Sequence, residues 1–320
     1  KRLGNAVDPF YALDKYGADA LRWYMLTNAE PWDNLKFDEN GVDEVRRKFF
    51  GTLYNTYSFF ALYANIEGWT PGDGVEMVEI DGNMVNVDEG RQARPEIDRW
   101  ITSKLNTLIR DVRAAYEDYD VKTAGRLIET FVCDHVSNWY VRLNRSRFWN
   151  GDKDAFQTLY DVLMNIAVLS APIAPFFMDQ LYLDLTAVIP SETSVISSET
   201  SVISSEVEKS QESVHYVLMP EADASVIDPE LEERMELAQQ ATSMVLALRK
   251  KVGIPVRQPL SKMLVPVISD AVRARLEAVK DLILAEVNVK DLEFVTDTSG
   301  ILTKKIKPNF KTLGKVYGAR

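Results

Sequence analysis

Cysteine and histidine are scarce in this chain, and their scarcity excludes several kinds of site. The single cysteine, Cys133, excludes an internal disulfide and a cysteine-rich zinc site, and it fits a reducing location such as the cytoplasm. The two histidines, His135 and His215, do not complete a zinc-protease motif or a Ser-His-Asp set. We therefore expect no metal site and interpret Cys133 and His135 as structural residues.

Long apolar runs and nucleotide-binding loops are also missing. No run approaches the roughly 18 apolar residues of a membrane-spanning helix, so no membrane partner is expected. The chain has no complete P-loop and no glycine-rich dinucleotide motif, and among its many carboxylates no acid–base pair stands out. From the residues alone, the chain is predicted to be an RNA-binding helical module rather than a complete enzyme, without a cofactor of its own.

The net charge of −11 would argue against a nucleic-acid partner if the charge were evenly spread. It is segregated instead, because residues 186–240 carry 12 acidic side chains against 2 basic ones. Residues 245–262 contain five cations and no acid, and residues 300–320 contain six cations and no acid. Local basic segments matter more than the total charge for binding a polyanion, so nucleic acid remains a predicted partner.

Apolar residues recur at helical spacing along most of the chain. Helices are expected at residues 11–25, 42–65, 95–116, 122–147, 154 onward to the prolines at 172 and 175, 176–185 and 229–252. Their short connections favour an antiparallel bundle. Later, strand-like residues 263–268 and 291–295 flank a helical segment at 271–285. The predicted fold class is mainly α, with a helix bundle followed by a small α/β unit.

Two segments interrupt this pattern. Residues 68–94 are rich in glycine and acids, and we interpret them as a loop with room for a short hairpin. Residues 191–210 contain SETSVIS twice, which predicts a flexible acidic insertion, since adjacent Val and Ile do not fit a coiled coil. The expected domains are therefore residues 1–41, a bundle at 42–189, a linker at 190–227 and a C-terminal unit at 228–320.

The segment SNWYVRLNRSRFW, residues 137–149, offers the strongest binding pattern. On a helix, Asn138, Arg142, Arg145 and Trp149 would share one face at steps of four, three and four. The planar guanidinium of arginine can donate two hydrogen bonds to one phosphate group, and an aromatic ring can stack on an unpaired base. The pattern fits two interpretations equally well: an RNA-binding face, or an arginine-rich surface whose long side chains cover apolar area.

Three further segments carry cations beside residues that shape the backbone. KRLGN at 1–5 places two cations next to a glycine, which suits a phosphate, although a solvated chain end is the simpler interpretation. KKVGIPVRQPL at 250–260 would present Arg257 and Gln258 on a stiff loop, or would serve as a plain linker. KKIKPNFKTLGK at 304–315 interleaves cations with Asn309 and Phe310. This pattern favours a binding site for single-stranded RNA over a plain basic tail.

Together these segments resemble one family. KRLGNAVDP at 1–9 is similar to the tail of the KMSKS-type signature of class I aminoacyl-tRNA synthetases, with Arg2 where many members have serine. The resemblance is closest to isoleucyl-tRNA synthetases of the eukaryote-like type. It continues in order through YGADALRWYML (16–26), PWDNLKF (31–37), VRRKFFGTLYNTYSFFALYAN (45–65), DRWITSKLN (98–106), SNWYVRLNRSRFW, APIAPF (171–176), VRQPL (256–260) and KPNFKTLG (307–314). The valyl and leucyl families share several of these segments, whereas PWDNLKF and KPNFKTLG favour the isoleucyl family.

The resemblance implies that this chain is a piece of a longer enzyme, cut inside the signature loop. The catalytic nucleotide-binding fold and the editing domain would lie upstream. Lys1 aligns with the signature lysine, which would act on the phosphates of ATP only in the full-length enzyme. Isoleucine, ATP and magnesium are therefore expected to serve the full-length enzyme, and the chain alone is predicted to be catalytically inactive.

The function implied for this chain is recognition of isoleucine tRNA, with a monomer expected. The predicted tRNA contacts are Asn138, Trp139, Arg142, Arg145 and Arg147 on the bundle, and Arg257, Gln258, Lys307, Asn309, Phe310 and Lys311 in the C-terminal part. Trp139 has a second interpretation as a core residue. The alternatives are the same region of a valyl or leucyl enzyme, a helical protein-interaction module, or a self-contained enzyme that uses carboxylates.

Overall fold

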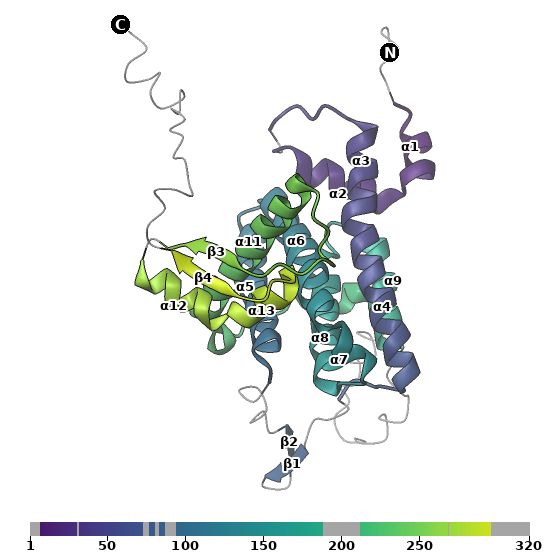
Figure 1. Ribbon diagram of the computed structural model, residues 1–320. Helices are drawn as coiled ribbons and strands as arrows, with labels where there is room; N and C mark the ends of the chain where they lie inside the picture. The colour runs from purple at the N-terminus through teal and green to yellow at the C-terminus, as the bar shows by residue number, and fades with distance from the viewer. Residues whose placement is uncertain are drawn as a thin grey trace, which may run out of the picture. The chain divides into compact units, whose positions relative to one another are not determined.

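The computed structural model describes residues 7–30, 32–72, 94–187, 212–267 and 269–295, together with the backbone of two strands at 77–80 and 83–86. The chain forms two compact units, Lys1–Glu232 and Glu233–Arg320. The predicted fold class is confirmed, since helices dominate the described residues and a small parallel sheet lies in the second unit (Figure 1). The four domain boundaries expected from the sequence remain a prediction, and the SETSVIS repeat lies outside the described residues.

The chain enters the first unit through two helices, α1 (Pro9–Tyr16) and α2 (Ala18–Asn28). The side chain of Asp8 caps α1 by accepting a hydrogen bond from the backbone N–H of Phe10, and Pro9 fits the first turn. The prediction of one helix over 11–25 was wrong at Gly17, which separates α1 from α2. Its φ of 83° lies in the left-handed region, which glycine adopts without a steric clash because it has no Cβ.

A long helical run follows and forms one side of the bundle. It consists of α3 (Glu39–Val45), a π-helical segment η1 (Arg46–Phe50) and α4 (Gly51–Glu67). Gly68 ends the run with a left-handed φ of 62°. After it, the strands β1 (Met77–Ile80) and β2 (Asn83–Asn86) pair antiparallel, so the hairpin considered for residues 68–94 is confirmed.

The remaining bundle helices appear where the apolar spacing predicted them. They are α5 (Glu96–Glu117), α6 (Val121–Thr130), the π-helical segment η3 (Phe131–Val141), α7 (Arg142–Trp149), α8 (Lys153–Ser170) and α9 (Pro175–Thr186). The segments α6, η3 and α7 run without a break over the helix predicted at 122–147. Two short 3₁₀ turns, η5 (Val214–Tyr216) and η6 (Ala224–Val226), complete the first unit.

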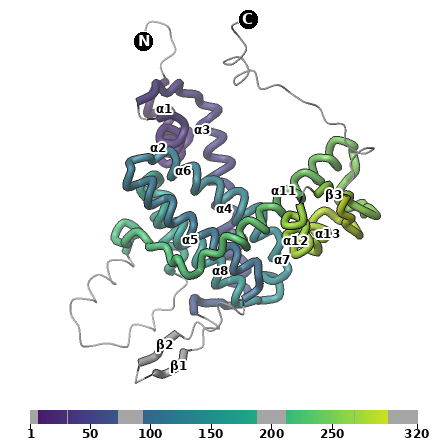
Figure 2. Tube along the Cα trace, turned by 90° about the vertical axis from the view of Figure 1, so that its left-hand side faces the viewer, coloured from purple at the N-terminus to yellow at the C-terminus, as the bar shows by residue number. Residues whose placement is uncertain are grey.

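The bundle core is built mainly from α4, α5, α6, η3 and α8. Helix α5 packs against α6, η3 and α8, and α4 packs against η3 and α8 (Figures 1 and 2). Aromatic rings also pack where α2 meets η1, in the stack of Trp23 on Phe49 with ring centres 4.1 Å apart. Trp100 and Phe156 are also fully buried. Each such side chain contributes about 1.5–3 kcal/mol through burial, so the bundle has a substantial apolar core.

The second unit has the predicted β-α-β order. Helix α11 (Pro229–Val252) leads into it, and the strands β3 (Met263–Pro266) and β4 (Leu292–Val295) pair in parallel. Two short helices lie between the strands in sequence, α12 (Asp270–Ala278) and α13 (Lys280–Val287). A single helix had been expected over 271–285, but the helical backbone breaks at Val279, with φ −113° and ψ 13°. Among the described helices, none is long and apolar enough to cross a membrane.

Candidate functional site

The outer face predicted on residues 137–149 is only partly exposed. Asn138 and Arg145 are exposed, and Trp149 keeps 57% of its surface accessible. Arg142 is half-buried. Within the described part of the chain, Arg145 has no ion-pair partner, so its guanidinium is available for an external anion. These residues lie on η3 and α7, and the π-helical segment widens the turns that precede α7.

Trp139 belongs to the bundle core. Only 3% of its surface is accessible, and the guanidinium carbon of Arg142 lies 5.9 Å from the centre of its ring. Since its ring lies in the core, it cannot stack on a base without opening the bundle. Trp149 is therefore the exposed tryptophan of this segment. The core interpretation of Trp139, left open by the sequence, fits its position.

Arg147 points into the protein and is held by two carboxylates. Its Nη1 and Nη2 each donate a 2.7 Å hydrogen bond to the carboxylate of Asp98, which is completely buried. Its Nε donates another 2.7 Å hydrogen bond to Asp152, which also caps α8. The hydroxyl of Tyr140 donates to Asp98 at 2.8 Å. Because this guanidinium already has anionic partners, we leave Arg147 out of the proposed tRNA contacts.

The charges of this cluster stabilise one another. Burial alone would lower the pKa of Arg147, but the hydrogen bonds that it donates to Asp98 and Asp152 raise it above its usual range. Burial would raise the pKa of Asp152, and the guanidinium of Arg147 outweighs this and lowers it. Arg147 and Asp152 therefore keep their charges at neutral pH. It links the start of α5 to the corner between α7 and α8, next to the exposed Arg145 and Trp149.

A shallow polar cavity of about 390 Å³ adjoins Asn138. Two cations line it, but Lys48 pairs with Glu44, and Arg126 pairs with Glu129 at 3.1 Å. The remaining lining residues are Thr52, Glu129, Thr130, Cys133 and Asp134. Cations and carboxylates thus balance around this cavity, which makes it a poor site for an isolated anion.

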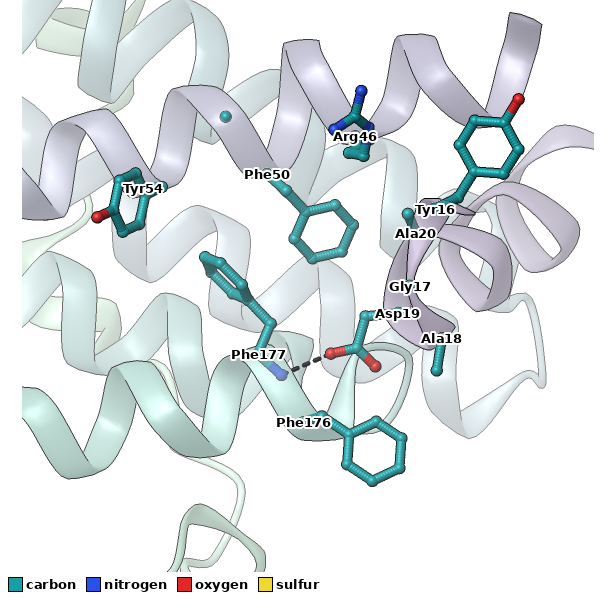
Figure 3. Close-up of a pocket in the computed structure, with 11 residues that line it drawn as sticks. Tyr16, Gly17, Ala18, Asp19, Ala20, Arg46, Phe50, Tyr54, Phe176 and Phe177 are labelled. Carbon is teal, nitrogen blue, oxygen red and sulfur yellow. Dashed lines mark hydrogen bonds between the residues drawn. The ribbon is translucent and has the colours of Figure 1, made fainter. Parts of the chain in front are cut away.

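A second cavity, of about 410 Å³, lies where the α1–α2 turn meets η1, α4 and the start of α9 (Figure 3). Aromatic rings, including those of Phe50 and Phe176, form much of its lining. Its buried carboxylate, Asp19, accepts a 2.5 Å hydrogen bond from the backbone N–H of Phe177. Asp19 therefore caps the first turn of α9, a role that its position in the sequence did not reveal.

In the second unit, the structure places Arg257 and Gln258 together on an exposed turn. The backbone N–H of Gln258 donates to the carbonyl of Pro255 at 3.0 Å, which closes a four-residue turn with Arg257 at its third position. Both side chains are exposed, as the stiff-loop interpretation predicted. Lys1, Lys307, Asn309, Phe310 and Lys311 lie outside the described residues, so their roles stay predictions.

Residues 98–264 match the family model described as the anticodon-binding domain of tRNA ligase. This match covers more than half of the chain. The chain belongs to this family. The matched stretch contains both the exposed residues on η3 and α7 and the turn at Arg257, so the two surfaces selected by their chemistry lie inside the anticodon-binding region.

Curated relatives identify the branch of the family. The chain is 53% identical to an isoleucine–tRNA ligase of Bacteroides fragilis, over 99% of this chain and 26% of that protein. It is 52% identical to the isoleucine–tRNA ligase of Porphyromonas gingivalis, over 99% of this chain and 25% of the relative. For the enzyme of Cytophaga hutchinsonii the identity is 50%, over 100% of this chain and 27% of the relative. The predicted isoleucyl resemblance is confirmed, and the chain spans about a quarter of these relatives' length.

Proposed function

We propose that this chain recognises the anticodon arm of isoleucine tRNA on behalf of an isoleucine–tRNA ligase. The observation that carries the proposal is the exposed group of Asn138, Arg145 and Trp149 inside the anticodon-binding region. An exposed arginine without an ion-pair partner among the described residues, beside an exposed tryptophan, combines a phosphate ligand with a stacking surface. The neighbouring Arg147 cannot serve the same purpose, because Asp98 and Asp152 already hold it.

Each residue of this group has a distinct role in the proposal. Arg145 binds backbone phosphates, and the half-buried Arg142 supports it from the preceding turn. Trp149 stacks on an unpaired base, an interaction worth roughly 1–3 kcal/mol. Asn138 hydrogen-bonds to a base edge, since its amide offers both a donor and an acceptor. Arg257 and Gln258 add a phosphate contact and a base contact from the second unit.

The ligase reaction itself is assigned to the rest of the longer enzyme. Its relatives are named for joining isoleucine to tRNA, and about three-quarters of their length lies outside the matched region. We place activation of isoleucine with ATP and magnesium, and the transfer to tRNA, in that larger part. Lys1 is proposed to contact the ATP phosphates there. The cytoplasm is the proposed location, because the substrates of translation are found there.

A salt titration of tRNA binding tests the proposal. The 320-residue chain is titrated with isoleucine tRNA and with valine tRNA at several salt concentrations. We expect tighter binding to the isoleucine tRNA and a linear fall of log K with log salt, with a slope of roughly −0.7 for each phosphate bound in single-stranded RNA. Equal, weak binding to both tRNAs would contradict anticodon recognition and leave only a general affinity for phosphate.

Single substitutions assign the contacts. Arg145→Gln should weaken binding to both tRNAs and reduce the salt slope by about one phosphate. Trp149→Ala should weaken binding about tenfold or more without changing the slope, and Trp149→Phe should retain most of the affinity. Lys153→Gln is the matched control, since Lys153 is an exposed cation at the start of α8. If Lys153→Gln and Arg145→Gln had equal effects, a specific role for Arg145 would be wrong.

A further inference from the structure

A buried arginine lies beneath the exposed turn of the second unit. Arg249, near the end of α11, has only 3% of its surface accessible. Its Nη1 donates to the carbonyls of Pro255 at 3.1 Å and Gln258 at 3.0 Å, and its Nη2 donates to the carbonyl of Asn288 at 2.9 Å. Within the described residues no carboxylate pairs with it. The hydrogen bonds of this buried guanidinium go to carbonyl groups alone, which indicates a dedicated structural task, because an ordinary buried charge would be paired with an opposite charge.

That task is to hold the turn formed by residues 255–258. Two of the three carbonyls belong to the first and last residues of the turn, and the third comes from the end of α13. Asn288 adds a second support, since its Nδ2 donates to the carbonyl of Val256 at 2.8 Å. Gly253, with φ 73°, lets the chain reverse directly after α11. The turn is therefore fixed from two sides.

The last turn of α11 and the fixed turn that follows it carry three exposed cations that we call the basic corner: Lys250, Lys251 and Arg257. All three are exposed, and in the described part of the chain none of them forms an ion pair. Residues 245–262 contain no acidic side chain. By contrast Lys262, at the edge of the segment, pairs with Glu293 at 2.7 Å. The basic corner thus presents uncompensated positive charge, whereas the lysine beside it is neutralised.

We propose that the basic corner binds the phosphodiester backbone of single-stranded RNA, and that Arg249 is the positioning residue that holds Arg257 and Gln258 toward it. The proposal rests on the proposed function and adds Lys250 and Lys251 to its contacts. RNA is favoured over an anionic membrane because Gln258, an amide suited to base edges, lies beside Arg257 and because the corner falls inside the anticodon-binding region.

Neutralising the corner tests the proposal. Lys250→Gln, Lys251→Gln and Arg257→Gln are titrated singly with isoleucine tRNA over a range of salt. We expect each to weaken binding several-fold and to reduce the magnitude of the salt slope by about 0.7, the value of one phosphate contact in single-stranded RNA. Lys262→Gln is the matched control and should leave the slope unchanged. Unchanged slopes for the three corner variants would overturn the proposal, as would tighter binding to vesicles with anionic lipid than to tRNA.

Arg249 needs a different readout, because a cation that touches no phosphate should not affect the slope. Arg249→Lys keeps the charge but loses the fork that reaches three carbonyls. We expect its affinity for tRNA to fall about tenfold with an unchanged salt slope, at a temperature where circular dichroism shows it folded. A folded Arg249→Lys protein with parental affinity, or a slope reduced by one phosphate, would refute the positioning role. If the variant does not fold, the three surface variants decide the proposal.

The outcomes separate this inference from the proposed function. If the parent chain shows no salt-dependent binding to tRNA, the proposed function fails. If the parent binds and Arg145→Gln weakens it, but the corner variants behave like the parent, only the basic corner is wrong.

Discussion

Asp19 caps a helix far along the chain, since its carboxylate accepts a 2.5 Å hydrogen bond from the backbone N–H of Phe177, 158 residues beyond it. Helix α9 begins with Pro175, and the N–H groups of its first turn need partners that its own sequence does not supply. Asp19, on α2, provides one. Burial raises the pKa of this carboxyl, while the hydrogen bonds from Phe177 and Phe176 act against the increase.

This raised pKa predicts a pH dependence of stability. The folded state holds the Asp19 proton more tightly than the unfolded state, whose carboxyl titrates near pH 3.9. The contribution of Asp19 to stability is therefore fully present below the unfolded pKa and is lost as the pH rises through the folded pKa. Asp19→Asn removes the titration and keeps an oxygen that can accept the hydrogen bond from Phe177.

Urea unfolding of both proteins between about pH 3 and pH 7 measures the difference. Relative to Asp19→Asn, the free energy of unfolding of the parent should fall as the pH rises. Asp154→Asn, an exposed substitution at the start of α8, serves as the control for the loss of one surface carboxylate. If the parent instead gained stability relative to Asp19→Asn as the pH rises, the hydrogen bonds from the first turn of α9 would outweigh the effect of burial on the pKa of Asp19.

Neutralising Arg147 should lower the free energy of unfolding strongly, whereas neutralising Arg145 should hardly change it. Arg147→Gln leaves the carboxylate of Asp98 fully buried without its cation, so we expect a loss of about 3–5 kcal/mol in the free energy of unfolding. Arg145→Gln, at an exposed position, should change it by less than about 0.5 kcal/mol. Removing both buried charges, in Asp98→Asn combined with Arg147→Gln, should cost less than the two separate losses added together. Equal losses for Arg145→Gln and Arg147→Gln would contradict this assignment.

Gly125 should resist replacement even by alanine. It lies in α6, where alanine would ordinarily favour the helix by about 1 kcal/mol. A Cβ there would lie 2.3 Å from Cγ2 of Thr27 on α2, so we expect Gly125→Ala to destabilise by roughly 1–3 kcal/mol. Adding Thr27→Ser removes Cγ2 and keeps the hydroxyl that donates to Trp23, and it should restore most of the loss.

Gly51→Ala is the matched control for this prediction. Gly51 also lies in a helix, and the nearest atom to a Cβ there, the carbonyl oxygen of Arg46, is at an ordinary 3.5 Å. Denaturant midpoints should therefore rise or stay constant for Gly51→Ala and fall for Gly125→Ala. If both midpoints rise, then α2 and α6 are less closely packed than described.

Cys133 should be a slow nucleophile. Burial, with smaller contributions from Glu129 and Asp134, raises its pKa to about 11, so little thiolate exists at neutral pH. Alkylation by iodoacetamide near pH 7.5 should be about three hundredfold slower than that of a free thiol with a pKa of about 8.5, in proportion to the thiolate present. Because the chain has a single cysteine, the rate against pH can be read directly. A plateau below pH 9 would contradict the raised pKa.

The helical elements could be predicted because their periodicity is local. Apolar spacing and helix-ending prolines and glycines gave the continuous run from α3 to α4, and the helices α5, α8, α9 and α11, close to their observed bounds. The prediction failed where backbone geometry departs from the regular 3.6-residue turn. Gly17 and Val279 divide predicted single helices.

The sequence by itself determined the helical class, the β-α-β order and the family, since these depend on local spacing and on motifs read along the chain. Only the tertiary structure decided which of two residues of the same type is buried and which is exposed. Arg145 and Arg147 differ by two positions, yet Asp98, 49 residues away from Arg147, holds one of them and leaves the other exposed. Trp139 and Trp149 divide in the same way between core and surface. Such choices follow from which distant groups meet on folding, because a buried charge needs a partner and a buried ring needs packing neighbours.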